Sequence, residues 1–275
     1  MGNPVAHSRS PWIHARFAAL TGQTLQYERR LVPLDGFAAS LAAFAAAGGK
    51  GCNITVPFKL EAAEAATQHS PRVALAGAAN TLAWQADGSW SADNTDGLGL
   101  VADITRNAGV ALAGTDILLI GAGGAAAGVL GPLLEQSPRR IVVCNRTAAK
   151  AEALVAQHAA LAALQKVELL ARPQQALEGD FDVIINGTAA SLQGAGVPVP
   201  ASVLRPGSLA YDMMYGPAAA TFLDWAAAHG ATGRDGLGML VEQAAESFAL
   251  WRGVRPPSAQ VLAELRALLA TEAGH

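Results

Sequence analysis

A glycine-rich turn between an apolar run and a helical pattern places the strongest constraint on how this chain can fold. Residues 116–120 read Asp-Ile-Leu-Leu-Ile, a run typical of a strand buried on both faces of a parallel sheet. Gly121-Ala122-Gly123-Gly124-Ala125-Ala126 follows and fits the G-x-G-x-x-G/A pattern. In that pattern glycines permit a tight turn and close approach to a pyrophosphate, which the helix N–H groups hold. The sequence predicts a dinucleotide site here, with a turn that binds nothing as the alternative.

Strand and helix patterns alternate from about residue 98 onward, and the alternation predicts the fold class. A strand followed by a helix, several times over, is typical of an α/β fold with a parallel, doubly wound sheet. Further strands are expected at 141–144, 167–169, 183–185 and 209–211, and helices at 98–108, from the glycine turn to about 136, and at 148–164.

The first 97 residues show a different arrangement of shorter elements. Ser10-Pro11 predicts a helix start, because proline is favoured in the first helical turn. Two helices, at about 239–251 and 258–270, are expected to end the chain. Between these we expect strands at 25–32 and 52–56, a helix at 37–47 closed by Gly48-Gly49, and another helix opened by Pro57.

The end of the second strand of the alternating region bears on which dinucleotide is bound. Sites for NAD usually place an Asp or Glu there, whose carboxylate accepts a hydrogen bond from the ribose 2′-hydroxyl. Here the sequence is Cys144-Asn145-Arg146-Thr147, which offers no carboxylate and an arginine suited to a 2′-phosphate. The sequence favours NADP over NAD, with a solvated arginine before a helix as the alternative.

Uncharged polar side chains gather in four clusters within the first hundred residues. Hydroxyl and amide groups of this kind are what a small polyhydroxylated acid needs for orientation. Lys59 is unusual because it lies in the first turn of a helix, where the macrodipole disfavours a cation; a surface lysine is the alternative. Asp96 precedes a helix and has a capping role as its alternative. The clusters are Asn3-Pro4 with His7-Ser8 and Ser10-Pro11, Asn53 with Thr55 and Lys59, Asn80-Thr81, and Asn94-Thr95-Asp96-Gly97.

Composition and charge exclude several classes of protein. Lys and Arg number 19 and Asp and Glu 22, and the net charge of −3 argues against a surface for nucleic acid or anionic membrane. A hydrophobic content of 51% with 15% charged residues excludes a disordered chain. No apolar run is long enough to span a bilayer, and the first residues do not resemble a signal peptide. The two cysteines form no metal-ligand or redox pattern, so we expect them to be reduced, in a cytoplasmic protein. The six histidines show no ligand spacing, so we expect no metal.

Separated motifs along the whole chain resemble those of the shikimate dehydrogenases, within the shikimate/quinate dehydrogenase superfamily. They follow in the family's order, and agreement at so many positions is far more specific than the glycine turn alone. The turn at Gly121 and the Asn145-Arg146-Thr147 segment resemble the family's NADP elements. The other motifs are Asn3-Pro4-Val-Ala-His7-Ser8-Arg-Ser10-Pro11, Gly51-Cys-Asn53-Ile-Thr55-Val-Pro57-Phe-Lys59, Gly77-Ala-Ala-Asn80-Thr81, Asp93-Asn94-Thr95-Asp96-Gly97, Tyr211-Asp212-Met213 and Asp235-Gly236-Leu-Gly-Met239-Leu-Val-Glu-Gln243.

The resemblance implies two α/β domains and an NADP-dependent oxidoreductase. Residues 1–97 with 237–275 would form the substrate domain, and residues 98–236 a Rossmann-like NADP domain with a doubly wound parallel sheet. The implied reaction is the reversible reduction of 3-dehydroshikimate to shikimate, in aromatic amino acid (chorismate) biosynthesis. Alternatives are a quinate/shikimate dehydrogenase using NAD, a dinucleotide-binding homologue without activity, and an enzyme of folate or tRNA-linked metabolism, which the N-terminal motifs disfavour. We expect small-molecule partners only and a monomer or homodimer.

The resemblance also implies roles for individual residues. Lys59 and Asp96 match the family's catalytic pair, and whether Lys59 acts as proton donor or as a fixed charge stays open. The residues implied to bind shikimate are Ser8, Ser10, Asn53, Thr55, Asn80, Tyr215 and Gln243. Those implied to bind NADP are Gly121, Ala122, Gly123, Gly124, Ala125, Asn145, Arg146, Thr147, Asn186, Thr188, Met213 and Gly236.

The N-terminus departs from the family pattern. Members enter the Gly2-Asn3-Pro4 motif from a β-strand, and here only Met1 precedes it. Either the true start lies upstream or the substrate sheet lacks a strand. A missing strand would remove a few buried side chains, each of which contributes ~1.5–3 kcal/mol. Their sum approaches the free energy of unfolding of a small domain, so we expect the chain to be marginally stable. There are two smaller departures. The family usually has Gly at the position of Ala92, and it often has Ala at the position of Gly187.

Overall fold

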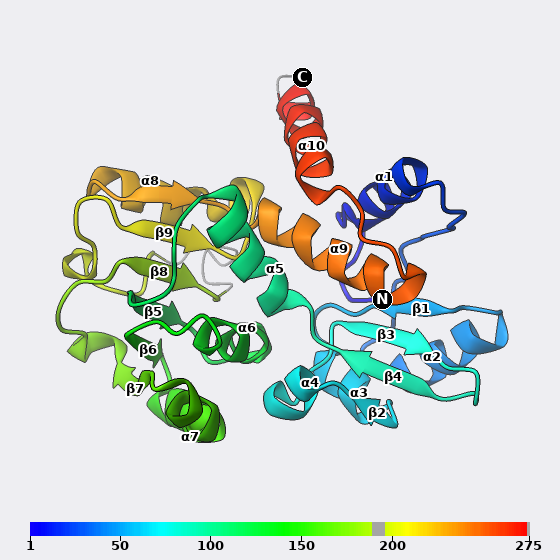
Figure 1. The fold of residues 1–275 in the computed structure, drawn as a ribbon, viewed down its shortest axis with the longest axis horizontal. Coiled ribbons are helices and arrows are strands. Elements are labelled where there is room, and N and C mark those ends of the chain that lie inside the picture. The colour runs from blue at the N-terminus through cyan, green and yellow to red at the C-terminus, as the bar shows by residue number, and fades with distance from the viewer. Residues whose placement is uncertain (189–195, 274–275) are drawn as a thin grey trace. The chain divides into compact units, whose positions relative to one another are not determined.

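The computed structural model describes residues 1–188 and 196–273, and the chain divides into two compact units (Figure 1). Unit 1 comprises Met1–Gly99 and Leu240–His275, and unit 2 comprises Leu100–Met239. The expected domain boundaries, after residues 97 and 236, lie close to the two points where the chain passes between these units. In the described ranges, no helix combines the length and apolarity needed to cross a membrane.

Unit 2 is built on a parallel sheet that has six strands among the described residues. Their order is β10-β9-β8-β5-β6-β7, which is the 3-2-1-4-5-6 order of doubly wound nucleotide-binding sheets. This order confirms the predicted α/β fold class. The strands are β5 (Asp116–Ile120), β6 (Arg140–Asn145), β7 (Glu168–Pro173), β8 (Val183–Asn186), β9 (Leu209–Asp212) and β10 (Thr232–Arg234).

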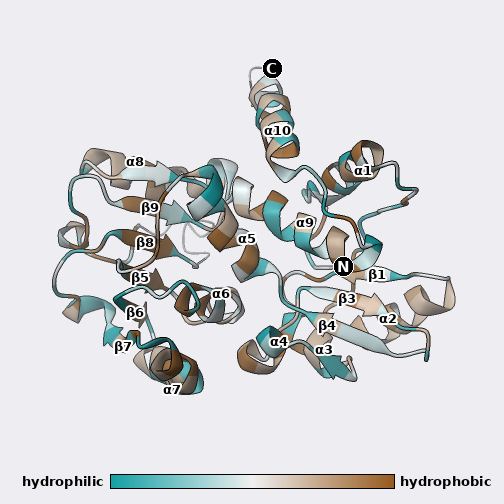
Figure 2. Ribbon diagram, in the orientation of Figure 1, coloured by the Kyte–Doolittle hydropathy of each residue, from teal (hydrophilic) through white to brown (hydrophobic). Residues whose placement is uncertain are grey.

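Helices cover both faces of this sheet. Alternate residues of a strand point to opposite sides, and here both sets are apolar, so each face needs helices to bury it. Leu119 of β5 lies in the core that α6 and α7 complete, whereas Ile120 lies in the core that α8 completes. The central strands β5 and β8 are fully buried and largely apolar (Figure 2), as burial on both faces requires. The helices are α6 (Gly124–Leu134), α7 (Ala148–Gln165) and α8 (Ala220–Ala228), with short 3₁₀ helices at Gln174–Ala176, Ala201–Val203 and Gly216–Ala219.

A buried carboxylate ties several segments of unit 2 together. The chain enters this unit through α5 (Asp96–Ala102), which continues as a π-helical stretch, Asp103–Asn107. Asp103 is fully buried and accepts hydrogen bonds from Arg234, at 2.6 and 2.8 Å, and from the Tyr211 hydroxyl at 2.8 Å. A side chain at Gly238 would overlap the Asp103 carboxylate. The π-helical stretch is thereby fastened to β9 and β10.

Unit 1 has a smaller, mixed sheet in the order β1-β3-β4-β2. Strand β3 is antiparallel to β1 and β4, and β2 is parallel to β4. The core joins Phe37 and Leu41 of α2 with Phe58, Leu82 and Trp90. The strands are β1 (Gly51–Asn53), β2 (Gln68–His69), β3 (Thr81–Trp84) and β4 (Trp90–Asp93), and the helices are α1 (Ser10–Thr21), α2 (Phe37–Ala46), α3 (Lys59–Glu64), α4 (Pro71–Ala76), α9 (Leu237–Arg252) and α10 (Ser258–Ala273).

The segment 25–32, predicted as a strand, is not one. Within the described part of the chain, its β-pairing is limited to a single parallel bridge between Leu31 and Gly2. On the other side of residues 1–3, the Thr55 N–H donates to the Met1 carbonyl at 3.0 Å. Residues 1–3 therefore lie between two extended segments, but they are too few to hold all of 25–32 in a ladder. The strand predicted at 52–56 is likewise shorter, Gly51–Asn53, and the helix predicted to open at Pro57 begins at Lys59.

Removing the buried carboxylate tests its structural importance. Asp103→Ala leaves Arg234 without its ion-pair partner in a largely buried position, and we expect the free energy of unfolding to fall by about 3–5 kcal/mol. Denaturant unfolding followed by circular dichroism measures the change. The matched control is the double variant Asp103→Leu/Arg234→Leu, which removes both charges and should recover much of the loss. Equal losses in the single and double variants would contradict this account.

Candidate active site and nucleotide site

A lysine and an aspartate that are far apart in the sequence are in contact in unit 1. The Lys59 ammonium donates a hydrogen bond to Oδ2 of Asp96 at 2.5 Å, and the two side chains are 18% and 9% exposed. Lys59 is the first residue of α3 and Asp96 the first of α5. The two residues that the sequence singled out thus form an ion pair shielded from most of the solvent, where their attraction is stronger than in water.

The second oxygen of the Asp96 carboxylate is also bound. Nδ2 of Asn80 donates to Oδ1 of Asp96 at 2.8 Å, and Oδ1 of Asn80 accepts from the Thr95 N–H at 2.9 Å. Asp96 is itself the first residue of α5, and its N–H donates to Oδ1 of Asn94 at 3.2 Å. The Asp96 carboxylate is therefore held in one orientation by an ammonium and an amide.

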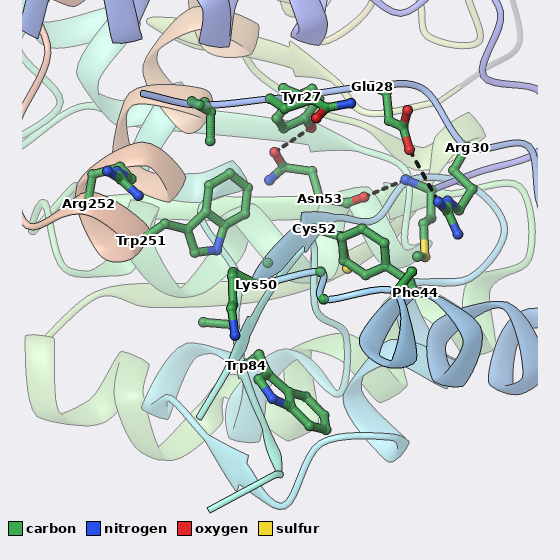
Figure 3. Close-up of a pocket in the computed structure, with 18 of the residues that line it drawn as sticks. Tyr27, Glu28, Arg30, Phe44, Lys50, Cys52, Asn53, Trp84, Trp251 and Arg252 are labelled. Carbon is green, nitrogen blue, oxygen red and sulfur yellow. Dashed lines mark hydrogen bonds and ion pairs between the residues drawn. The ribbon is translucent and has the colours of Figure 1, made fainter. Parts of the chain in front are cut away.

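Hydroxyl groups extend this network to Asn53. The Thr81 hydroxyl donates to Oδ1 of Asn80 at 2.9 Å and lies 2.7 Å from the Ser247 hydroxyl. Ser247 in turn accepts from Nδ2 of Asn53 at 2.9 Å, and Tyr27 donates to Oδ1 of Asn53 at 2.9 Å. Sequence reasoning gave Ser247 and Tyr27 no role. Ser247 lies in an amphipathic helical pattern and Tyr27 in a segment of mixed polar and apolar residues, so only the fold reveals their contacts, of which that of Tyr27 with Asn53 is drawn in Figure 3.

Gln243 of α9 belongs to the same network. Its Oε1 accepts from Nδ2 of Asn80 at 3.3 Å, and its backbone carbonyl accepts from the Thr95 hydroxyl at 3.1 Å. Three of the residues implied to bind substrate are thus connected: Asn80 bonds Asp96, and Asn53 and Gln243 each bond Asn80.

The other residues implied to bind substrate lie elsewhere. The Ser8 hydroxyl accepts the backbone N–H of Ser10 at 3.3 Å, at the start of α1. Thr55 is exposed and follows β1. Tyr215 belongs to unit 2, where it precedes the 3₁₀ helix Gly216–Ala219. Both serines and Thr55 belong to unit 1 with Lys59.

The glycine-rich turn lies in unit 2, between the carboxyl end of β5 and α6. Gly121 has φ of +111°, and a Cβ there would lie 3.3 Å from the carbonyl oxygen of Gly187, in the loop after β8. The Gly187 N–H donates to the Ile120 carbonyl at 2.8 Å. Strands β5 and β8 flank the point where the strand order reverses, which is where doubly wound sheets bind ligands. A Cβ at Gly123 or Gly124 would meet open space, so the start of α6 presents its backbone N–H groups.

The end of β6 lies beside this turn. Cys144 of β6 is in register with Ile120 of β5, and Asn145 is the last residue of the strand. Nδ2 of Asn145 donates to the Thr147 carbonyl at 3.0 Å, which shapes the turn into α7. Arg146 is exposed within that turn, so its guanidinium is accessible to a ligand phosphate.

Asn186 organises the loops after β8 and β9. Its Oδ1 accepts from the N–H and the hydroxyl of Thr188, at 3.1 and 2.7 Å, and its Nδ2 donates to Asp212 at 2.9 Å. Burial raises the pKa of the Asp212 carboxyl to about 6. Sequence reasoning gave Asp212 no role, although an acidic residue at the end of a parallel strand was an available signal. A Cβ at Gly236 would overlap the backbone of Met213, so the two segments need a glycine there to approach.

Metal ligands do not gather in the described part of the chain. Within residues 1–188 and 196–273, no group of three or more His, Cys, Asp or Glu side chains is arranged to hold a metal ion. His275 lies outside the described residues.

Family models match most of the chain. The shikimate dehydrogenase substrate binding domain matches residues 1–82, the shikimate/quinate 5-dehydrogenase model residues 103–193, and the shikimate 5′-dehydrogenase C-terminal domain residues 236–266.

Curated relatives and solved structures also match nearly the whole chain. The NADP⁺ shikimate dehydrogenases of Acidovorax sp. (strain JS42) and Verminephrobacter eiseniae are 77% and 71% identical, over 99% of this chain and 96% and 95% of theirs. The shikimate 5-dehydrogenase of Thermus thermophilus, in complex with NADP(H) and shikimate, is 31% identical over 97% of each chain, with a TM-score of 0.82. The Ael1 enzyme of Pseudomonas putida is 45% identical over 96% of each chain, with a TM-score of 0.87. The chain therefore belongs to the NADP-dependent shikimate dehydrogenase family of oxidoreductases.

Proposed function

We propose that this chain catalyses the reversible transfer of hydride between NADPH and the C3 carbonyl of 3-dehydroshikimate, giving shikimate. The observation that carries the proposal is the Lys59–Asp96 ion pair, whose carboxylate is also held by Asn80. The names of the relatives and the ligands of the Thermus structure support this choice of cofactor and substrate. A cytoplasmic location and a monomeric or homodimeric state stay predictions.

The chemistry required of the protein is the stabilisation of charge on the carbonyl oxygen. NADPH, when bound, supplies the hydride to the carbonyl carbon, and the oxygen becomes an alkoxide. The Lys59 ammonium donates a hydrogen bond to that oxygen and is the group from which a proton is transferred. Asp96 positions the ammonium and keeps lone pairs for a substrate hydroxyl, because each of its oxygens is occupied by one donor.

Substrate recognition is assigned to the uncharged polar residues. Ser8 and Ser10 are proposed to bind the carboxylate, and Asn80 with Gln243 the hydroxyls. Asn53 gives its N–H groups to Ser247 and neighbouring acceptors, so its contribution is a carbonyl oxygen held in place by Tyr27. The complete proposed set is Ser8, Ser10, Asn53, Thr55, Asn80, Tyr215 and Gln243.

The residues of unit 2 fit a phosphorylated dinucleotide. A Cβ at Gly121 would press on the loop after β8, so only glycine lets the two loops close around a pyrophosphate. The backbone at Gly123 and Gly124 is open above the start of α6, where helix N–H groups hold phosphate. Arg146 is assigned to the 2′-phosphate and Met213 with Gly236 to the nicotinamide end. Asn186 and Thr188 are assigned to the loop beside the cofactor.

A kinetic assay of Lys59→Met tests the proposed chemistry. Because the ammonium acts on charge that develops in the transition state, we expect kcat for shikimate oxidation to fall by about 10²–10⁴-fold with little change in KM. NADPH absorbance follows the reaction, and Lys166→Met in the nucleotide unit is the control. A variant with near-normal kcat would remove Lys59 from the mechanism. Faster turnover by the unchanged chain of quinate with NAD than of shikimate with NADP would contradict the proposed substrates.

Exchanging Arg146 tests the choice of NADP. Arg146→Asp replaces the partner of the 2′-phosphate with a repelling charge, so the KM for NADP should rise by at least about tenfold while that for NAD does not rise. Steady-state kinetics with each cofactor gives the ratio. Lys166→Asp, at the other end of α7, makes the same charge change and should leave the ratio unaltered. An unchanged KM for NADP in Arg146→Asp would reject the assignment.

A further inference from the structure

The Asp212 carboxylate, at the carboxyl end of β9, is fully buried and accepts a hydrogen bond on each oxygen. Oδ1 accepts from the Met214 N–H at 2.8 Å, and Oδ2 accepts from Nδ2 of Asn186 at 2.9 Å. Because both donors are neutral, they offset only part of the free energy lost when water leaves this carboxylate. Burial raises its pKa to about 6, and carboxyl groups with raised pKa values cluster at functional sites. The carboxylate therefore calls for a role beyond stabilising the fold.

The hydrogen bonds around Asp212 require two acceptors at this position. The Met214 N–H can only donate, so it needs an oxygen. The Asn186 amide is oriented from its other end, because its Oδ1 accepts from the Thr188 N–H at 3.1 Å, which leaves Nδ2 to face Asp212. An asparagine at position 212 has one oxygen and one NH₂ group, so it would set its NH₂ against one of the two donors. Only an ionised carboxylate satisfies both.

The same chain of hydrogen bonds fixes what the Thr188 hydroxyl can offer to a ligand. This hydroxyl lies 2.7 Å from Oδ1 of Asn186. An amide oxygen can only accept, so the hydroxyl gives its hydrogen to Asn186 and keeps its lone pairs for another partner. The Thr188 side chain is partly exposed. A phosphate oxygen is itself an acceptor, so the ligand group that meets this hydroxyl is an O–H or N–H donor and not the pyrophosphate.

The loop that carries Thr188 lies against two parts of the proposed nucleotide site. A Cβ at Gly121 would lie 3.1 Å from Cγ2 of Thr188, so this side chain packs on the glycine-rich turn. On the other side, the Met213 N–H donates to the Asn186 carbonyl at 3.0 Å, and a Cβ at Gly187 would lie 3.3 Å from Sδ of Met213. The turn is assigned to the pyrophosphate and Met213 to the nicotinamide. The group of NADP that joins these two is the nicotinamide ribose.

We propose that Asp212 is a positioning residue for the cofactor, which orients the Asn186 amide so that the Thr188 hydroxyl accepts a hydrogen bond from the nicotinamide riboside half of NADP. The donor is a ribose hydroxyl or the carboxamide N–H. This inference rests on the proposed function, from which it takes the cofactor. If position 212 offers an NH₂ group to Asn186, the Asn186 amide has to turn over. Its NH₂ then faces the Thr188 N–H, and the loop loses both of its hydrogen bonds.

Exchanging the two side chains tests the positioning role. Asp212→Asn loses one acceptor, and Asn186→Asp sets two carboxylates against each other. The double variant Asp212→Asn/Asn186→Asp restores every hydrogen bond, because the carboxylate then accepts from Thr188 and from the amide, whose oxygen accepts the Met214 N–H. Each single variant should raise the Kd for NADPH by about tenfold, and the double variant should return it to within about threefold of the unchanged chain.

Binding is measured without substrate, by titrating NADPH fluorescence with protein at about pH 8, where the Asp212 carboxyl is ionised. Asp224→Asn is the matched control, because it makes the same change of charge at an exposed position of α8. It should bind NADPH as the unchanged chain does. The melting temperature of each variant without nucleotide shows that it is folded at the temperature of the titration.

Thr188→Val tests the hydroxyl itself. Its Kd for NADP⁺ should rise by about tenfold, and adding Asp212→Asn should raise it little further, because both changes act through one hydroxyl. Adenosine 2′-phosphate 5′-diphosphate keeps the pyrophosphate but lacks the nicotinamide riboside, so Thr188→Val and the unchanged chain should bind it equally. The 3-acetylpyridine analogue of NADP⁺ lacks the carboxamide N–H. An equal loss of its affinity in Thr188→Val assigns the donor to a ribose hydroxyl, and no loss assigns it to the carboxamide.

Three results would each overturn the proposal. They are an unchanged Kd for NADPH in Asp212→Asn, a double exchange variant that binds no more tightly than the single variants, and weaker binding of adenosine 2′-phosphate 5′-diphosphate by Thr188→Val. If Asp212→Asn does not fold, Thr188→Val with these ligands still tests the same hydroxyl. Shikimate oxidation is measured separately on the unchanged chain, so failure here leaves the proposed function untouched.

Discussion

The proposed chemistry depends on the buried Asp96 carboxylate and its two partners. A charge shielded from water is costly unless it is paired and hydrogen-bonded, and here Lys59 and Asn80 each take one oxygen. Asn80 can do so because its own oxygen is held by Thr95 and Thr81. Contacts among segments this far apart in the sequence form only when all of unit 1 has folded, so the charge and its position are products of the whole unit.

The fully buried strands could be predicted because their sequences are continuous runs of apolar residues. The run at 116–120 coincides with β5, and the parallel sheet of unit 2 follows from repeated alternation. Strand β10 was missed, since Thr-Gly-Arg at the edge of the sheet carries no apolar signal. The hairpin of β3 and β4 was also missed, although Asp87-Gly88 between them is a recognisable turn. The error at 25–32 has another cause, because a strand exists only where a partner is long enough to pair with it.

The residues of the candidate site also fall into two groups, those that the sequence identified and those that only the structure revealed. Lys59, Asp96 and Asn80 are in short motifs, which a resemblance can identify one at a time. Ser247 and Tyr27 act through contacts with residues distant in sequence, and neither stands out in its own segment. A local sequence pattern therefore identifies residues whose chemistry is unexpected in their segment, such as Lys59 in the first turn of a helix. It does not identify ordinary residues that orient those groups.

The Asp103 carboxylate has a consequence for how sequences of this kind can diverge. Tyr211 and Arg234 donate to it, and the lack of a side chain at Gly238 leaves room for it. Tyr211, Arg234 and Gly238 thus all depend on the one carboxylate at Asp103, and a substitution at any of these four positions disturbs the other three. We expect such positions to change together, because a chimaera that exchanges one of them alone would receive a residue without the neighbours that suit it.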